Sequence, residues 1–142
     1  MTANVFAYGT LCLSEVMELV AGEKVLGLPA ELRNYSRYAI KERVFPGIVA
    51  EEHGLVDGVL YQGVSTEGLR RIGFFEDDFY ERQEVCVELS DGTQCQASAY
   101  VIPDRLRHVL TQEPWDLRIF VESCGGEYLK RAEQWMASYL KS

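Results

Sequence analysis

The segment from Val25 to Val64 constrains the fold most, because it consists of short strand-like stretches that turn-forming residues keep separating. The stretches are 25–32, 37–41, 48–51 and 56–64, and the residues between or within them that favour turns are Pro29, Asn34, Pro46-Gly47 and Gly54. Proline, asparagine and glycine at such positions allow the chain to reverse direction. Strands this short and this closely spaced predict a curled sheet or a small barrel.

A strand, a glycine turn and a helix precede this segment. Val5-Phe6-Ala7-Tyr8 is typical of a short buried strand. Ser14 is placed to cap a helix, and Gly22 is placed to end it. After the strand segment, Ser65 or Thr66 can cap a second short helix, so that Glu76 is expected just beyond that helix.

The next two strands form a hairpin whose register follows from the pattern of apolar residues. A two-residue turn at 91–92 would place apolar residues opposite polar ones on the same face. A three-residue loop at 90–92 sets Val87 against Cys95 and keeps the apolar side chains together. Cys86 and Cys95 then face opposite sides of the sheet, so we expect no disulfide between them.

The C-terminal part is predicted to be helical. Pro114 can occupy the first turn of a helix, and Cys124-Gly125-Gly126 is expected to break the chain. After this break, the apolar residues at helical spacing are Leu129, Ala132, Trp135, Met136, Tyr139 and Leu140. This stripe predicts an amphipathic helix packed on the body of the protein, and the same stripe would suit a homodimer interface.

The 142 residues, 47% of them hydrophobic, suffice for one domain with its own core but not for two. We therefore expect a single α+β domain over residues 1–142. No window approaches the roughly 18 apolar residues that a membrane-spanning helix needs, which predicts a soluble, cytoplasmic protein that does not bind a membrane. The net charge of -8, without a basic block, argues against nucleic acid as a partner.

Glu76 is the first candidate for chemistry. It follows the apolar residues Phe74 and Phe75, and burial among these rings would raise the pKa of its carboxyl group toward neutrality. Such a group can accept a proton and return it. The alternative interpretation is an ordinary solvated loop, because Asp77 and Asp78 follow directly and we expect both of these to face water.

The second candidate is the turn Tyr8-Gly9-Thr10-Leu11. Gly9 can adopt a positive φ and let the backbone approach a ligand, and the N–H groups near the following helix start can bind an anion such as a carboxylate. The alternative is a simple strand-to-helix turn that needs glycine only for its geometry. Tyr80 and Arg82 could frame the same cavity as Glu76, and ordinary cross-strand packing would explain both residues equally well.

Cys12 is a third candidate because a thiol near a helix N-terminus can become a nucleophile. No histidine supports this role, since His53 and His108 are isolated in the sequence. We interpret Cys12 as a small apolar residue. The cysteines and histidines also lack the spacing of a zinc site, so no metal is expected.

Taken together, five motifs in order resemble the gamma-glutamylcyclotransferase-like family, and in particular its AIG2-like and gamma-glutamylamine cyclotransferase branch. The motifs are 5–11 (VFAYGTL), 45–49 (FPGIV), 58–61 (GVLY), Phe75-Glu76 with Tyr80 and Arg82, and Trp115-Asp116 with Phe120. The resemblance covers roughly residues 4 to 121.

The resemblance implies a small mixed β-barrel surrounded by helices, with a cavity at one end. It implies that Tyr8 to Leu11 bind the α-carboxylate of a γ-glutamyl group, that Tyr80 also belongs to the substrate-binding site, and that Glu76 is the acid-base catalyst. The expected reaction converts a γ-glutamyl amine or amide to 5-oxoproline and a free amine, without a metal or cofactor. The implied partner is this small-molecule substrate.

The chain departs from the family pattern at two positions. Relatives commonly have an aspartate where this chain has Gly73, and a glycine where it has Asp77. The residues leave open a non-catalytic module that binds a small anion or a γ-glutamyl compound. They do not specify the group attached to the γ-glutamyl moiety.

Overall fold

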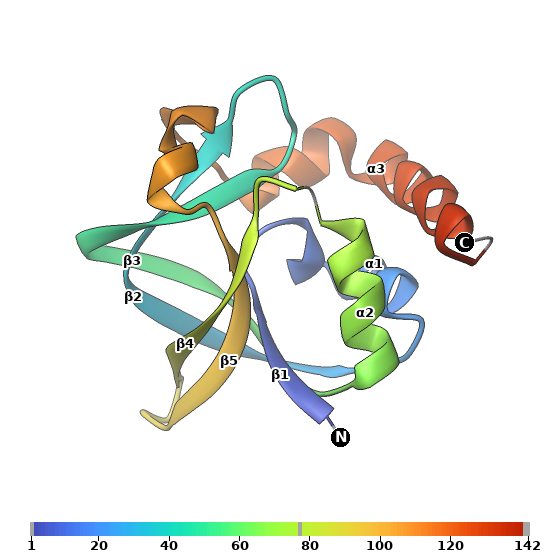
Figure 1. The fold of residues 1–142 in the computed structure, drawn as a ribbon, viewed down its shortest axis with the longest axis horizontal. Coiled ribbons are helices and arrows are strands. Elements are labelled where there is room, and N and C mark those ends of the chain that lie inside the picture. The colour runs from blue at the N-terminus through green and yellow to red at the C-terminus, as the bar shows by residue number, and fades with distance from the viewer. Residues whose placement is uncertain (1, 77, 141–142) are drawn as a thin grey trace.

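The strands of the computed structural model, which describes residues 2–76 and 78–140, wrap into a roughly closed barrel (Figure 1). The strands of the described chain are β1 (Thr2–Ala7), β2 (Leu26–Ile40), β3 (Pro46–Ser65), β4 (Glu81–Leu89), β5 (Gln94–Val101) and β6 (Leu110–Pro114). The α-helices are α1 (Ser14–Ala21), α2 (Thr66–Phe75) and α3 (Leu117–Leu140), and 3-10 helices cover Thr10–Cys12 and Asp104–Val109.

Strand pairing returns to its starting point, which closes the barrel. β1 pairs with β3, β3 with β2, β2 with β4, β4 with β5, and β5 again with β1, while β6 extends the sheet beyond β2. The β1–β5 pair is parallel and the others are antiparallel. The predicted α+β fold with a small mixed barrel is therefore confirmed.

The segment from 25 to 64 forms two long strands rather than the four short ones expected. β2 and β3 pair along almost their whole length, with a shift in register between Arg33 and Tyr35. Asn34, at φ 67°, and His53, at φ 67°, take left-handed conformations there, and the amide of His53 donates a hydrogen bond of 3.2 Å to Asn34 Oδ1. The turn-forming residues thus produce a bulge that bends the hairpin without ending its strands.

The β4–β5 hairpin has the predicted register. Val87 pairs with Cys95, and Cys86 pairs with Gln96. The loop at 90–92 has Gly92 in the left-handed region at φ 88°. Cys86 is exposed whereas Cys95 is half-buried, which agrees with their opposite orientation, and all four cysteines are free.

The two short helices largely agree with the predictions made from the sequence. Gly22 ends α1 in the left-handed conformation, but Ser14 is the first helical residue and Leu13 takes the cap position without a side-chain bond. Ser65 caps α2, because its Oγ accepts a hydrogen bond of 2.9 Å from the amide of Gly68. Glu76 is the residue that ends α2, as expected.

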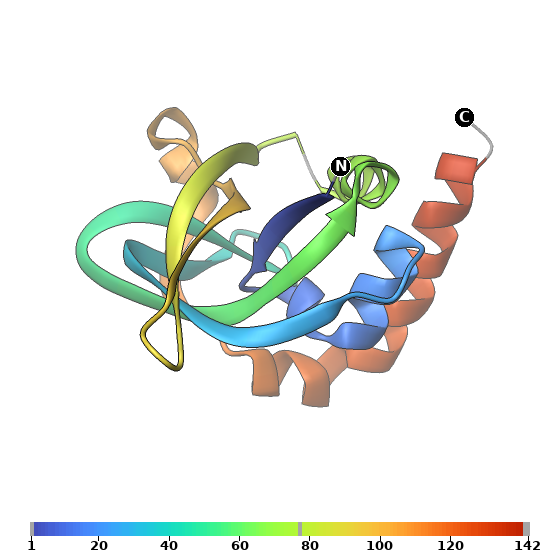
Figure 2. The same ribbon diagram turned by 90° about the horizontal axis from the view of Figure 1, so that it is seen from below.

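The C-terminal region differs from its prediction. Pro114 ends β6 instead of opening a helix, and Asp116 caps α3 by accepting a hydrogen bond of 2.8 Å from the amide of Arg118. α3 continues through Gly125 and Gly126 as one helix, so the expected break is wrong, although Figure 2 shows the helix axis changing direction along its course. Packing against the body of the protein holds the helix together where intrinsic propensity is weak.

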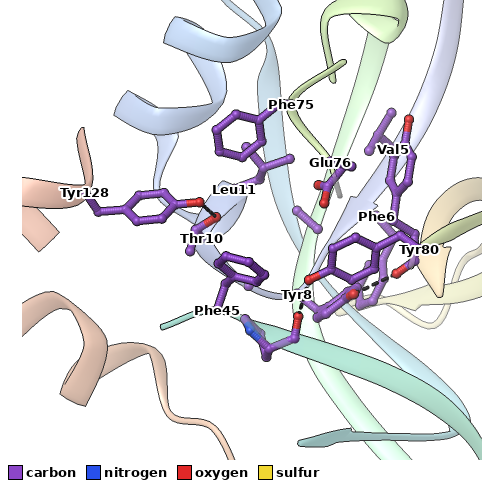
Figure 3. Close-up of a pocket in the computed structure, with 14 residues that line it drawn as sticks. Val5, Phe6, Tyr8, Thr10, Leu11, Phe45, Phe75, Glu76, Tyr80 and Tyr128 are labelled. Carbon is purple, nitrogen blue, oxygen red and sulfur yellow. Dashed lines mark hydrogen bonds between the residues drawn. The ribbon is translucent and has the colours of Figure 1, made fainter. Parts of the chain in front are cut away.

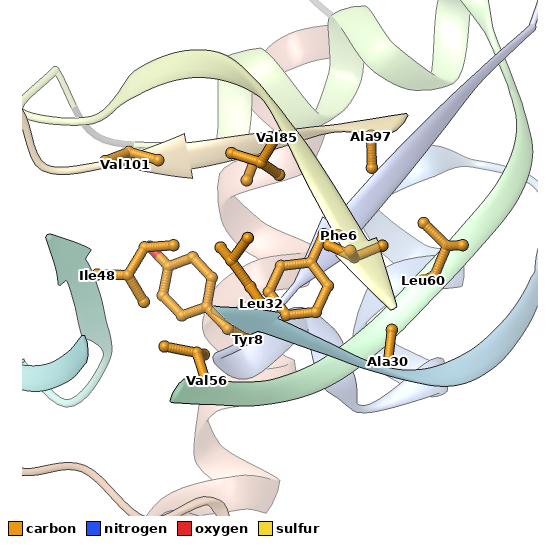
Figure 4. Packing of buried hydrophobic residues seen from close by; sticks show 12 residues of the cluster. Phe6, Tyr8, Ala30, Leu32, Ile48, Val56, Leu60, Val85, Ala97 and Val101 are labelled. Atoms are coloured by element: carbon orange, nitrogen blue, oxygen red, sulfur yellow. The ribbon is translucent and has the colours of Figure 1, made fainter. Parts of the chain in front are cut away.

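Apolar side chains form three clusters in the described chain, of which the smallest includes Ile40, Ile102 and Leu110. The first fills the barrel with side chains that include Phe6, Leu32 and Val85, as Figure 4 shows. The second lies between the barrel and its helices and includes Met17, Ile72 and Met136. The three α-helices gather on one side of the barrel (Figures 1 and 2). The end of β1 and the end of α2 are therefore both anchored in packed cores.

The predicted apolar stripe of α3 packs only in part against this core. Ala132 and Met136 are buried, whereas Trp135 is 54% exposed. Within the described chain, no helix has the length and apolar character needed to cross a bilayer. The same residues contain no group of three or more His, Cys, Asp or Glu side chains placed to hold a metal ion.

Candidate active site

A cavity of about 50 Å³ lies where β1 leads into the glycine turn. Its wall is formed by residues 5–11, Phe45, Pro46, Phe75, Glu76, Tyr80, Tyr100 and Tyr128. All the predicted site residues line it, namely Tyr8, Gly9, Thr10, Leu11, Glu76 and Tyr80 (Figure 3). Segments far apart in the sequence thus meet at one end of β1.

Glu76 contributes the carboxylate of this cavity. It is half-buried, its amide donates a hydrogen bond of 3.0 Å to the carbonyl of Ile72, and Figure 3 shows its side chain directed toward the cavity. Burial raises the pKa of Tyr8 and of Tyr100, and the negative charge of Glu76 raises both further. The carboxylate of Glu76 therefore lies close enough to both phenols for its charge to affect their pKa values. Whether the pKa of Glu76 itself is raised stays a prediction.

Asp77 and Asp78, the two acidic residues after Glu76, are both predicted to face water. Asp78 is exposed, as expected. Asp77 lies outside the described residues, so its predicted exposure stays a prediction.

Gly9 serves the turn in a different way from the one predicted. Its φ is -126°, so the expectation of a positive φ is wrong. Glycine is needed because a Cβ atom at this position would lie 2.9 Å from the Cδ and Cγ atoms of Pro46, which is closer than side chains pack. The absence of a side chain thus lets the turn lie directly against Pro46, the first residue of β3.

The turn continues as a 3-10 helix over Thr10–Cys12, in which the amide of Cys12 donates a hydrogen bond of 3.0 Å to the carbonyl of Gly9. The first N–H groups of a helix have no intrahelical acceptor. In this turn they are the N–H groups of Thr10 and Leu11, two residues that line the cavity. These donors are suited to an anion.

Side chains behind the turn donate hydrogen bonds to carbonyl groups of the turn and of the residue before it. Arg37 Nη1 donates to Tyr8 O at 2.8 Å, Tyr61 OH donates to Leu11 O at 2.7 Å, and Cys12 Sγ donates to Ala7 O at 3.3 Å. The C=O and N–H groups of a trans peptide point in opposite directions. Arg37 therefore directs the N–H group of Gly9 away from itself. No sequence motif pointed to Arg37.

Tyrosine hydroxyls connect the walls of the cavity. Tyr8 donates a hydrogen bond of 2.6 Å to the carbonyl of Tyr100, and Tyr80 donates one of 2.6 Å to the carbonyl of Pro46. Thr10 Oγ1 donates a longer bond of 3.4 Å to the hydroxyl of Tyr128. Sequence reasoning missed Tyr100 and Tyr128, because only the long-range packing of β5 and α3 brings them to the turn.

The remaining candidates do not join the cavity. Cys12 is absent from its lining, and burial raises the pKa of its thiol to about 12, so the thiol is protonated at neutral pH and a poor nucleophile. His53 and His108 are exposed. Arg82 is also absent from the lining, so its expected place beside Glu76 in this cavity is wrong.

Comparison with known proteins agrees with this architecture. Residues 5–117 match the family model described as gamma-glutamyl cyclotransferase, AIG2-like. AIG2-like protein D of Arabidopsis thaliana is 33% identical over 100 residues, which cover 69% of this chain and 66% of that protein. The chain thus spans less than two thirds of the length of that curated relative.

Solved structures are similar over almost the whole chain. The solution structure of an Arabidopsis thaliana protein has a TM-score of 0.72 at 24% identity and covers 100% of this chain and 86% of that one. A structure of a gamma-glutamyl cyclotransferase has a TM-score of 0.65 at 15% identity, with coverage of 94% and 87%. The structural likeness shows the fold. The family match, at residues 5–117, includes both the glycine turn and Glu76. The chain belongs to the gamma-glutamyl cyclotransferase, AIG2-like family.

Proposed function

We propose that this protein is a cyclotransferase that converts a γ-glutamyl amine or amide to 5-oxoproline and a free amine. The observation that carries the proposal is that Glu76 and the turn Gly9 to Leu11 line one cavity. A carboxyl group and backbone donors suited to a carboxylate therefore share one cavity, which supports the proposal.

In the proposed reaction, the α-amine of the substrate, in its neutral form, attacks the substrate's own γ-carbonyl carbon. A new bond joins this nitrogen to the γ-carbon, and the bond from the γ-carbon to the leaving nitrogen breaks. Glu76, ionised at the start, takes one proton from the attacking amine and delivers one to the leaving nitrogen. The protons balance within one turnover, and no water is consumed.

The turn would supply orientation. The N–H groups around Gly9 to Leu11 would bind the α-carboxylate and hold the α-amine over the carbonyl. Such positioning of an intramolecular reaction can be worth roughly 7 to 11 kcal/mol. Proton transfer by one side chain is typically worth about 10²- to 10⁴-fold in rate. Orientation is therefore the larger of the two proposed contributions.

Replacement of the acid tests the proposal directly. Glu76→Gln keeps the size of the side chain but cannot carry a proton, so release of 5-oxoproline should fall by about 10²-fold or more. The affinity for a γ-glutamyl compound, measured by calorimetry, should stay close to that of the parent protein. Asp78→Asn, at an exposed acid two positions further along, is the matched control and should keep full activity.

A panel of substrates separates catalysis from simple binding. It contains γ-glutamyl amines, γ-glutamyl amino acids, glutathione and γ-glutamyl-ε-lysine, and each is assayed for 5-oxoproline. Undiminished turnover by Glu76→Gln would refute the assigned role of this residue. Tight binding of panel members by the parent protein without any product would replace the enzyme by a binding module.

A further inference from the structure

Of the described residues that line the candidate active site, Tyr128 alone lies outside the family match. The others fall within 5–117, the part of the chain that matches the family model. Tyr128 comes from α3, which begins at Leu117. The helix that follows the matched segment therefore adds a side chain of its own to the site.

Tyr128 contacts both parts of this site. Its hydroxyl accepts a hydrogen bond of 3.4 Å from Thr10 Oγ1 in the turn, as Figure 3 shows. Its ring packs edge-on against the ring of Phe75, with the ring centroids 6.3 Å apart and an interplanar angle of 86°. Phe75 is the last residue of α2 and directly precedes Glu76. One side chain thus joins the turn to the end of the helix that presents the acid.

A row of aromatic rings holds Tyr128 in place. Phe120, which is buried, packs edge-on against Tyr128 with the ring centroids 5.2 Å apart, and Trp115 packs against Phe120 at 5.6 Å. The indole of Trp115 donates a hydrogen bond of 2.8 Å to the carbonyl of Val44, in the loop between β2 and β3. Aromatic pairs stabilise a structure beyond the area that they bury. The sequence motif that includes Trp115 and Phe120, to which the proposed reaction gives no role, therefore fixes the first part of α3 and with it Tyr128.

We infer that Tyr128 is a positioning residue, which holds the turn at Thr10 and the end of α2 at Phe75 at a fixed spacing. Its effect on turnover rests on the proposed function, in which one substrate extends from the N–H groups of the turn to the carboxyl group of Glu76. The rate of such an oriented reaction falls steeply when the groups that hold and attack the substrate are displaced. A side chain that contacts both walls keeps their separation constant.

Tyr128→Phe tests the hydroxyl by itself. The ring keeps its contact with Phe75, but the bond to Thr10 is lost, and a neutral hydrogen bond is worth a factor of about two to ten. KM for the panel compound that the parent protein turns over fastest should rise by this factor, while kcat changes less. In a Thr10→Val background the same substitution should have no further effect, because the hydroxyl acts through Thr10.

Tyr128→Leu tests the ring. The end of α2 then loses its edge contact at Phe75, and Glu76 loses part of its support. We expect kcat to fall by about tenfold or more in addition to the rise in KM.

Tyr139→Phe is the matched control on the same helix. Tyr139 packs edge-on against Phe74 with the ring centroids 5.2 Å apart and donates a hydrogen bond to Glu67, but it does not line the cavity. This variant also loses one hydroxyl of α3 that bonds to another element. It should keep the kcat and KM of the parent protein.

Amide hydrogen exchange measures the order of the turn without a substrate. The amide of Cys12 donates a hydrogen bond of 3.0 Å to the carbonyl of Gly9, so its exchange reports opening of the turn. Nuclear magnetic resonance should show this exchange about two- to tenfold faster in Tyr128→Phe and unchanged in Tyr139→Phe.

The outcomes separate this inference from the proposed function. An unchanged KM or an unchanged exchange rate in Tyr128→Phe would overturn the positioning role, while 5-oxoproline release still supported the cyclotransferase. Equal changes in Tyr139→Phe would also overturn it, because they would reflect a general loosening of α3. If no panel compound gave 5-oxoproline, the proposed enzyme would fall, and faster exchange in Tyr128→Phe alone would still support the positioning of the turn.

Discussion

Arg37 illustrates how one side chain can control the direction of a backbone donor. Its guanidinium donates hydrogen bonds to the carbonyl groups of Tyr8 and Asp57 at 2.8 and 2.9 Å, and it pairs with the carboxylate of Asp57 at 2.7 Å. Only 19% of its side chain is exposed, so these bonds are partly shielded from water. Arg37 does not line the cavity, so it is placed to orient the peptide between Tyr8 and Gly9 from outside it.

We expect Arg37→Met to weaken substrate binding more than it slows chemistry. Hydrogen bonds from a charged donor are worth about 1.5–3 kcal/mol, and without this one the Tyr8–Gly9 peptide can rotate. KM for a γ-glutamyl substrate should therefore rise by about tenfold or more, while kcat falls less. Steady-state kinetics over a range of substrate concentrations measure both quantities.

Asp57→Asn is the control for this positioning role. It removes the charge that pairs with Arg37 but leaves the bond from Arg37 to the carbonyl of Tyr8 in place, so KM should stay near that of the parent protein. A similar rise in KM in both variants would mean that the ion pair, rather than the carbonyl contact, orders the turn. An unchanged KM in Arg37→Met would remove the positioning role.

At the residue scale, the sequence identified the part of the candidate site that is contiguous in the chain. The turn from Tyr8 to Leu11 and the acid Glu76 could be found because each belongs to a short motif. Tyr100 and Tyr128 could not, because their place depends on how β5 and α3 pack around the turn. Arg82 points to the same limit, since its nearness to Glu76 in sequence does not bring it into the same cavity.

At the scale of secondary structure, local rules succeeded where local interactions decide the outcome. The β4–β5 register follows from side-chain alternation and one loop glycine. Ser65 caps α2 through a hydrogen bond from Gly68, which is only three residues further along the chain. Tertiary packing decided the other cases. Asn34 bends a strand that the sequence appeared to end, and α3 continues through Gly125 and Gly126 because one side of it is buried.

We expect Gly126→Ala to stabilise the protein. A Cβ atom at Gly126 meets nothing within 4 Å, and alanine is favoured over glycine inside a helix by about 0.5–1 kcal/mol. For a chain of this size, 1 kcal/mol corresponds to a rise in Tm of about 2–4 °C. Urea unfolding followed by circular dichroism gives the free energy of unfolding.

Gly92→Ala is the matched control for this prediction. A Cβ atom at Gly92 also meets nothing within 4 Å, but the residue has a φ of 88°, which alanine adopts only with strain. This variant should lose stability. If both variants changed stability in the same direction, backbone conformation would not be the cause of the difference.

At the scale of the whole molecule, folding buries the phenol groups of three tyrosines along with the apolar side chains of the core. Burial is the largest cause of the raised pKa values of Tyr8, Tyr61 and Tyr100. In the unfolded chain these groups return to the ordinary value near 10.0. Their titration is therefore coupled to the cooperative unfolding of the barrel, and the sign of the coupling can be worked out.

A phenol whose pKa is raised by folding releases its proton more readily in the unfolded chain. The stability that this contributes is complete below about pH 10, the unfolded value, and is lost as the pH rises toward the folded value, which is about 12 for Tyr100. We expect the free energy of unfolding to decline steeply over this interval. Urea titrations at a series of pH values measure the decline, and ultraviolet difference spectra follow phenol ionisation.

Charge repulsion must be separated from this effect, because a chain of net charge -8 becomes still more negative as its lysines lose their protons. Added salt screens repulsion between exposed charges but barely affects the burial of a phenol. The part of the decline that persists in 1 M salt should therefore belong to the tyrosines, and Tyr100→Phe should reduce it. A decline that salt abolishes, with native phenols titrating near the ordinary value, would show that these side chains reach water in the folded protein.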